Sequence, residues 1–292
     1  MKTQKLYKAR FEGWYFKHQA NGKSLALIPG KAEDTAFIQI VTDKWASIVT
    51  YPLSEYTRRG NVLTIGKNIF TPKGVRLNIN TPKITLSGKI TYGTLTPLKS
   101  DIMGPFRFFP MECTHGIVSM EHKIRGKVIL NGDLIDFGGG CGYIESDSGR
   151  SFPSDYTWVH CNNFKDDNCS IMIAVARIPF CGIKFWGCIA VVHLNGREYR
   201  LATYNGVKIL CCNRNSIVIK QGKRTLSVSL DNSGHRICLP APSLGKMSHV
   251  IREKLSCGAF FRFTEGDKVL FEGYSNLASH EWEMGVELIK SK

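Results

Sequence analysis

Two segments of the chain concentrate ionisable side chains among aromatic ones. The first, residues 103–122, places Glu112, His115 and His122 beside several phenylalanines. Ligand pockets have this composition, because apolar walls are combined there with a few polar groups that orient the ligand. A carboxyl group packed against aromatic rings also has a raised pKa, so it can hold a proton near neutral pH and donate it. The first segment therefore predicts a pocket suited to acid–base chemistry.

The second segment, residues 143–164, is denser still in groups that can take part in chemistry. A solvent-exposed strand would not carry so many large aromatic residues, and a strand buried in the hydrophobic core would not carry so many ionisable groups. We therefore interpret this segment as part of the same kind of pocket. Its ionisable, amide and aromatic residues include Glu145, Asp147, Arg150, Phe152, Asp155, Tyr156, Trp158, His160, Asn162 and Asn163.

Structural interpretations of the same residues stay open. Glu145, Asp147 and Arg150 can form a local network of ion pairs and a turn. The two histidines of the first segment can be satisfied histidines of the core or the surface. Together with Glu112 they can contribute to a metal site, although nothing in their spacing demands one. We expect no metal ion and no cofactor.

Sequence motifs of the common nucleotide-binding and hydrolytic enzymes are missing. There is no P-loop, no GxGxxG after a strand, no HExxH and no GxSxG. The glycine-rich run at residues 138–142 lacks the Lys-Ser/Thr pair of a phosphate-binding loop. Within a strand, such a run indicates a bulge or a wall that lets a ligand approach the backbone.

The elements that must position these residues are strands. Short alternating or β-branched runs predict strands at residues 35–41, 74–79, 83–90, 127–134, 216–220 and 225–230. Asn-Gly pairs, which suit the positive φ angles of type I′ hairpin turns, occur at residues 21–22, 131–132, 195–196 and 205–206. Residues 244–256 alone have helical spacing of apolar side chains, and they can also be a loop leading into a strand. The sequence predicts an all-β meander closed into barrels or sandwiches.

The length of the chain, 292 residues, suits one large domain or two of ordinary size. A polar break at residues 165–168 separates two apolar strands. We therefore predict an N-terminal domain at residues 1–165, which carries the segments described above, and a C-terminal domain at residues 166–292.

The net charge of +15 favours anionic partners, but the cations are scattered along the chain. No basic cluster of the nucleic-acid-binding type occurs, so we expect no nucleic acid partner. The N-terminus has no apolar signal segment, and no run of 18 apolar residues is present. We expect a cytoplasmic protein, with peripheral contact at the inner face of the membrane if its ligand is lipophilic.

Three motifs of the chain resemble those of the tocopherol cyclase-like proteins. They are FEGWYFK at residues 11–17, MGPFRFFPMECTHGIVSMEH at residues 103–122 and GYIESDSGRSFPSDYTWVHCNNF at residues 142–164. Their combined length makes chance a poor explanation. The resemblance implies a bacterial member of the family, with two antiparallel lipocalin-like or calycin-like β-barrel domains related to the carotenoid hydratases.

The resemblance also implies an activity. Tocopherol cyclases protonate the prenyl double bond of a phytyl hydroquinone, and the phenol oxygen then captures the tertiary cation without a redox cofactor or metal. For proton transfer we assign Glu145 and Asp147, with Glu112 and His115 as a second pair. The residues assigned to ligand binding are Trp14, Tyr15, Phe152 and Trp158 as pocket walls, and Arg150, His160 and Asn162 near the polar end.

The third motif departs from the plant-type members at two positions. Ser148 stands where those proteins have Trp, and His160 stands where they tend to have Gln. These differences predict another head group, so we expect an intramolecular cyclase or isomerase that acts on a prenylated quinol or related isoprenoid. The alternative is a non-catalytic carrier of a lipophilic small molecule, which would not need Glu145 and Asp147. The sequence gives no expectation for the oligomeric state.

Overall fold

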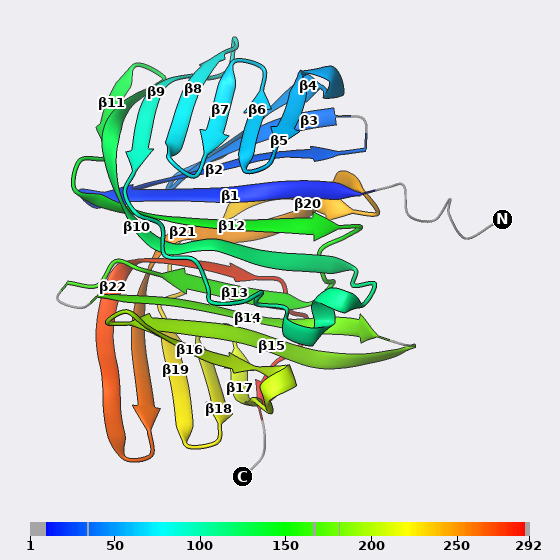
Figure 1. Cartoon of the computed structure of the whole chain (residues 1–292), viewed down its shortest axis with the longest axis vertical. Coiled ribbons are helices and arrows are strands. Elements are labelled where there is room, and N and C mark those ends of the chain that lie inside the picture. The colour runs from blue at the N-terminus through cyan, green and yellow to red at the C-terminus, as the bar shows by residue number, and fades with distance from the viewer. Residues whose placement is uncertain (1–9, 34, 166–167, 181, 290–292) are drawn as a thin grey trace. The chain divides into compact units, whose positions relative to one another are not determined.

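The computed structural model describes residues 10–33, 35–165, 168–180 and 182–289. The described residues form strands and three short 3-10 turns, without an α-helix, in two antiparallel sheets (Figure 1). The prediction of an all-β fold is confirmed. None of the helical turns in the described part of the chain has the length and apolar character needed to span a membrane.

The chain divides into two compact units that are interleaved in sequence. Unit 1 comprises residues 1–98, 113–151 and 240–249, and unit 2 comprises residues 99–112, 152–239 and 250–292. These units differ from the two contiguous halves predicted from the polar break at residues 165–168. Residues 152–164, which are part of the predicted pocket segment at residues 143–164, fall in unit 2.

The first sheet has the strand order β4-β3-β2-β1-β12-β10-β9-β8-β7-β6-β5, with β11 paired to β10. Among the described residues no ladder joins β4 to β5, so hydrogen bonds do not close this sheet into the predicted barrel. Pro52 ends β4 without an N–H to donate, and the 3-10 turn η2 (Leu53–Glu55) follows it. The strands are β1 (Phe11–Ala20), β2 (Lys23–Ala32), β3 (Thr35–Thr42), β4 (Ala46–Pro52), β5 (Tyr56–Arg59), β6 (Val62–Ile65), β7 (Asn68–Thr71), β8 (Gly74–Asn80), β9 (Thr85–Tyr92), β10 (Cys113–Leu130), β11 (Asp133–Asp136) and β12 (Gly140–Gly149).

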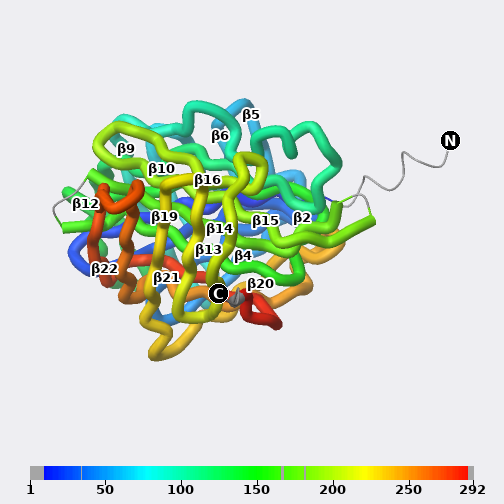
Figure 2. The backbone as a smooth tube through the Cα atoms, turned by 90° about the horizontal axis from the view of Figure 1, so that it is seen from below, coloured from blue at the N-terminus to red at the C-terminus, as the bar shows by residue number. Residues whose placement is uncertain are grey.

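The second sheet has the order β16-β15-β14-β13-β22-β21-β19-β18-β17-β23, with β20 paired to β21. Figure 2 shows β22, β21 and β19 running side by side. Its end strands, β16 and β23, are likewise not joined by a ladder among the described residues. The strands are β13 (Tyr156–Cys161), β14 (Cys169–Phe180), β15 (Ile183–Leu194), β16 (Arg197–Ala202), β17 (Lys208–Asn213), β18 (Ser216–Gln221), β19 (Arg224–Leu230), β20 (Ile237–Ser243), β21 (Lys246–Glu265), β22 (Lys268–Trp282) and β23 (Leu288–Ile289).

Each sheet buries one face in its own hydrophobic core. In the first, Leu25, Leu27 and Ile38 are fully buried; in the second, Ile171 and Ile173 are. Successive side chains of a strand point to opposite faces, so each of these strands also has a second face that is not part of its core. The position of each predicted site residue therefore depends on which of these two faces its side chain points to.

The Asn-Gly pairs form the predicted hairpin turns with one exception. Three of the pairs, at residues 21–22, 131–132 and 195–196, have positive φ at both positions and join adjacent antiparallel strands. The fourth pair ends the 3-10 turn η4 (Thr203–Asn205), and there only Gly206 has a positive φ. The turn at residues 131–132 also divides the strand predicted at 127–134 into the end of β10 and the start of β11.

The helical spacing noted at residues 244–256 is misleading, because this segment forms a turn and the first half of β21. From Ile251 onward every second residue is buried, through Leu255, Cys257 and Ala259 to Phe263. Pairing with β22 from Glu253 onward and with β19 from Ala259 onward satisfies the backbone of β21, and tertiary context overrides the weak local pattern.

Candidate acid–base site

The candidate site lies on three neighbouring strands of unit 1, β1, β12 and β10 (Figure 1). The register places Asp147 opposite His115 of β10, and Glu145 opposite Tyr15 of β1. Residues directly opposite each other on antiparallel strands project to the same face, as do residues two apart on one strand. Glu145, Asp147, His115 and Tyr15 therefore share one face, and Ile144 of the unit 1 core points to the other.

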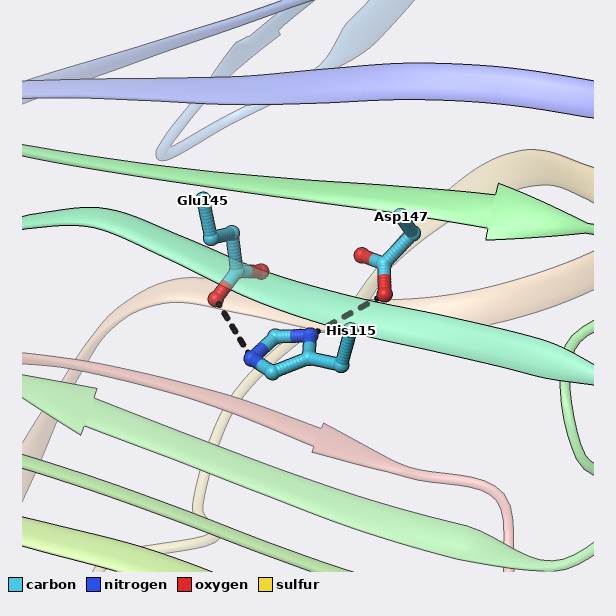
Figure 3. A group of neighbouring side chains, drawn as sticks. All are labelled: His115, Glu145 and Asp147. Atoms are coloured by element: carbon cyan, nitrogen blue, oxygen red, sulfur yellow. Dashed lines mark hydrogen bonds and ion pairs between the residues drawn. The ribbon is translucent and has the colours of Figure 1, made fainter. Parts of the chain in front are cut away.

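The imidazole of His115 lies between the two carboxylates (Figure 3). Its Nδ1 is 3.0 Å from Asp147 Oδ1, and its Nε2 is 3.6 Å from Glu145 Oε2. The exposed fractions of the side chains are 13% for His115, 19% for Asp147 and 8% for Glu145. The group is thus largely shielded from water, which strengthens its electrostatic interactions.

Two further side chains extend this group, and neither was predicted as a site residue from the sequence. The Tyr143 hydroxyl donates a hydrogen bond to Glu145 Oε2. The Cys113 thiol lies 3.7 Å from Asp147 Oδ1. A signal was present, because Tyr143 precedes Glu145 by two positions and Cys113 precedes His115 by two, which puts each on the same face of its strand.

This geometry favours proton transfer. Asp147 faces one ring nitrogen of His115, so it can fix the tautomer and orientation of the imidazole. The other nitrogen then faces Glu145 Oε2 at 3.6 Å, which is longer than a hydrogen bond, so a proton can pass between these two groups once they move closer together. A carboxyl group and an imidazole that share a proton form a general acid and base pair.

The same three residues also have the composition of a cation site, since one potential ligand atom from each lies within 4.8 Å of the others. The two nitrogens of His115, however, each face a different carboxylate. A metal ion would be held by only one of them, whereas the observed arrangement uses both. The residues therefore fit an imidazole that is hydrogen-bonded to Asp147 and faces Glu145 better than a metal centre.

The other predicted residues of unit 1 divide between the two faces of the sheet. Tyr15 lies beside Glu145 and is 7% exposed. Trp14, its neighbour in β1, points to the core, where it stacks with Phe16 under the guanidinium of Arg58. It therefore does not join the group around His115.

Arg150 does not take part in the ion-pair network considered from the sequence. It is exposed, its carbonyl accepts a hydrogen bond from the Gly245 N–H, and its guanidinium forms no ion pair with a described residue.

The remaining predicted residues belong to unit 2. On β13, Trp158 and His160 share one face, stacked with ring centroids 6.0 Å apart, while Val159 and Cys161 point to the unit 2 core. Phe152 packs edge-on against Tyr156, and Asn162 is buried just after β13. Glu112 precedes β10 and is half-buried.

A second histidine cluster lies inside the unit 1 core, on the opposite face of the same strands. His18 and His122 both pair with Gly142 in the register, from β1 and β10. His18 Nε2 is 2.6 Å from the Tyr92 hydroxyl, and its Nδ1 is 3.2 Å from the Leu25 carbonyl. The sequence-level idea of a metal site that combines His115 with His122 is therefore wrong, because these residues point to opposite faces.

Burial sets the protonation state of this core cluster. It lowers the pKa of His18 to about 3 and that of His122 to about 4, so both are neutral. Burial also raises the pKa of Tyr92 well above its usual value, which keeps its hydroxyl protonated as the donor to His18. The Gly142 position has no room for a side chain, since a Cβ there would clash with His122. In this part of the glycine-rich run the glycine makes room for a histidine ring.

Comparisons with known proteins agree with this architecture. The chain is similar in structure to a protein assigned as AttH from Nitrosomonas europaea, with a TM-score of 0.53 and 12% identity over 94% of this chain and 93% of that one. It is similar to CghA in complex with Sch210972, with a TM-score of 0.59 and 9% identity over 95% and 89% of the two chains. Kievitone hydratase from Nectria haematococca gives a TM-score of 0.53 and 11% identity over 95% and 90%. At these identities the likeness concerns the fold alone.

No curated protein matches the sequence. The profile of the family described as tocopherol cyclase-like matches residues 71–224, which is more than half of the chain and includes β10, β12 and β13. The three motifs singled out in the sequence lead to the same family. The chain belongs to the tocopherol cyclase-like family.

Proposed function

We propose that this protein is an enzyme that uses Glu145, His115 and Asp147 to protonate an alkene of an isoprenoid substrate. The observation that carries the proposal is the imidazole of His115 held between two shielded carboxylates. A purely structural strand pair has no need of such a group, because burying two carboxylates and a histidine together costs free energy. Such costs are typical of sites that perform chemistry.

The proposed reaction is an intramolecular cyclisation of a prenylated quinol or a related compound. Glu145, in its protonated form, donates its proton to the alkene and creates a tertiary cation. The phenol oxygen of the same molecule attacks that cation, and the phenol proton returns to the Glu145–His115 pair. One proton enters and one leaves, so the product is an isomer of the substrate and no cofactor is consumed.

Each residue has a distinct part in this scheme. Asp147 orients His115 through Nδ1, and His115 Nε2 carries the proton to and from Glu145. Tyr143 donates a hydrogen bond to Glu145 and so stabilises the carboxylate left after proton donation. Tyr15, next to Glu145 in the register, offers an aromatic side chain to the cation.

The test is capture and conversion of a substrate by the full chain. Purified protein is incubated with a lipid and quinol extract, and bound molecules are identified by native mass spectrometry followed by chromatography. We expect the wild-type protein to return a molecule of unchanged mass and altered retention, and Glu145→Gln and His115→Gln to return it unaltered. Asp136→Asn, a change at an exposed carboxylate of β11, is the matched control and should behave as wild type.

The carrier alternative makes the opposite prediction. If wild type and both variants bind the same molecule and none alters it, the carboxylates have a structural role and the protein is a binding protein for a lipophilic molecule. If the product differs in mass by one water, the cation is captured by water and the enzyme is a hydratase.

A further inference from the structure

The two most exposed large apolar side chains among the described residues of unit 2, Phe108 and Ile183, lie in two segments that also carry the exposed Phe109. Phe108 is 75% exposed and Phe109 is 48% exposed, at the end of the 3-10 turn η3 (Gly104–Phe108) and just after it. Ile183, the first residue of β15, is 65% exposed. Single exposed apolar residues are ordinary, but a contiguous group of them indicates an interaction surface.

Ring contacts join these two segments into one surface. Phe109 packs edge-on against Phe180, with ring centroids 5.2 Å apart, and Phe180 is the register partner of Ile183. Phe106 lies behind them, 5.7 Å from Phe180 and 6.1 Å from Phe185. The exposed side chains are therefore held on a packed aromatic base. We call Phe108, Phe109 and Ile183 the apolar tip.

Exposed cations flank the apolar tip. The guanidinium of Arg107 lies 4.5 Å from the ring centre of Phe108, and Lys184 lies at the same end of β15 as Ile183, with its side chain on the opposite face of the strand. Neither cation is paired with a carboxylate among the described residues, and both are exposed. The whole chain carries a net charge of +15, so its surroundings do not oppose binding to an anionic surface.

We propose that the apolar tip, with Arg107 and Lys184, docks on the surface of an anionic phospholipid membrane. Aromatic and aliphatic side chains at a protruding end enter the boundary between headgroups and acyl chains, where lysine and arginine beside them meet the lipid phosphates. The proposal goes beyond the proposed reaction and does not depend on it.

The experiment is co-sedimentation of the full chain with vesicles. Vesicles of phosphatidylglycerol and phosphatidylcholine are compared with vesicles of phosphatidylcholine alone, at low and high salt. We expect binding to the anionic vesicles that weakens with salt. A variant with Phe108→Ser, Phe109→Ser and Ile183→Ser should lower the partition coefficient about 100-fold, because most of the inserted apolar area is removed.

Two further variants separate the contribution of the two cations to membrane binding from that of the apolar side chains. Arg107→Gln with Lys184→Gln should lower binding about tenfold and reduce its dependence on salt. Ile129→Ser with Leu134→Ser is the matched control, since these residues of β10 and β11 are also exposed, at 46% and 57%. This control should bind as wild type does. All changes lie on the surface, so folding is checked simply by circular dichroism.

Several outcomes would overturn the proposal. Wild-type protein that stays in solution with all vesicles would do so, as would a tip variant that binds as well as the control. Equal binding to neutral and anionic vesicles would remove the part assigned to Arg107 and Lys184. A dimer in sedimentation velocity without lipid, lost only in the tip variant, would make the tip an interface between two copies of the chain.

Discussion

Two histidine clusters use the same two strands, β10 and β12, in opposite ways. On one face His115 lies between Glu145 and Asp147. On the other face His122 hydrogen-bonds Ser119, a neutral partner. Both are shielded from water, so the difference lies in the charge of the partners.

The core cluster shows what burial does to a histidine without a carboxylate. The Ser119 hydroxyl donates to the Glu121 carbonyl and accepts from the Thr96 N–H, so His122 Nδ1 must carry the hydrogen that it shares with Ser119. Its Nε2 has no hydrogen-bond partner among the described residues. Such a histidine stays neutral and has no group to exchange a proton with. The comparison teaches that the carboxylates, and not burial alone, make the His115 face suited to chemistry.

The largest expected effect is on turnover, and it separates the two faces directly. His115→Gln should lower the rate of product formation about 100-fold or more, because it removes a general acid and base. His122→Gln should change the rate per folded molecule less than about threefold, since it lies on the other face. Rates are measured by chromatography of the product under saturating substrate. An equal loss in both variants would refute the division of roles.

The second effect is a loss of stability in acid that comes from the core cluster. His18 and His122 have folded-state pKa values of about 3 and about 4, below the unfolded value of 6.5. The unfolded chain therefore binds more protons, and the free energy of unfolding falls as the pH drops from 6.5 toward 4. Each histidine contributes on the order of 3 kcal/mol to this loss. Urea unfolding at pH 7, 6, 5 and 4 measures it.

Two variants test whether His122 contributes to this dependence of the free energy of unfolding on pH. His122→Asn removes one of the titrating groups, so the dependence of stability on pH should be shallower than in the wild type. His235→Asn, at an exposed position, should leave the slope unchanged. His280 of unit 2, whose pKa burial also lowers, acts in the same direction and is present in all three proteins. Parallel slopes in all three would show that His122 does not titrate as inferred.

A third effect tests the room that Gly142 makes for the core cluster. Gly142→Ala should destabilise the protein by about 1–3 kcal/mol, because the added Cβ meets His122 and the ring has little space to move. Gly13→Ala is the control, since a Cβ there meets only Ile28 Cγ2 at 4.0 Å. Urea unfolding at pH 7 gives both values. Equal stability of the two variants would mean that the core around His122 relaxes freely.

The smallest effect concerns the hydrogen bond from Tyr143 to Glu145. Tyr143→Phe keeps the ring and removes the donor, so the carboxylate left after proton donation loses one stabilising contact. We expect about a tenfold lower rate, in line with the net value of a hydrogen bond to a charged group. Tyr274→Phe, at an exposed tyrosine of β22, serves as the control. An unchanged rate in Tyr143→Phe would place the proton transfer away from Glu145.

Much of the strand pattern could be predicted because it depends on local chemistry. The runs at residues 35–41 and 216–220 became β3 and β18, since β-branched residues suit a strand wherever it lies. The turn at residues 21–22 needed only two residues that accept positive φ. The segment at 244–256 failed for the converse reason, because its backbone conformation depends on pairing with other strands, among them β22, which follows it in the chain.

The candidate site was predictable only in part. Glu145 and Asp147 stand two positions apart, so their common face follows from the sequence once β12 is known to be a strand. That His115 lies between them depends on the register of β10 against β12, which hydrogen bonds between distant segments decide. Trp14 was assigned to the pocket with Tyr15, although neighbours in a strand must point to opposite faces.

The sequence by itself determined the family, the all-β class, the hairpin turns and the residue types available for acid–base chemistry. Each of these depends on side-chain identity and on spacing along a few residues. Only the tertiary structure decided which histidine meets the carboxylates and which is enclosed in the core, and how the chain divides into two interleaved units. The physical reason is that strand register and the choice of buried face are set by pairing between segments far apart in the chain.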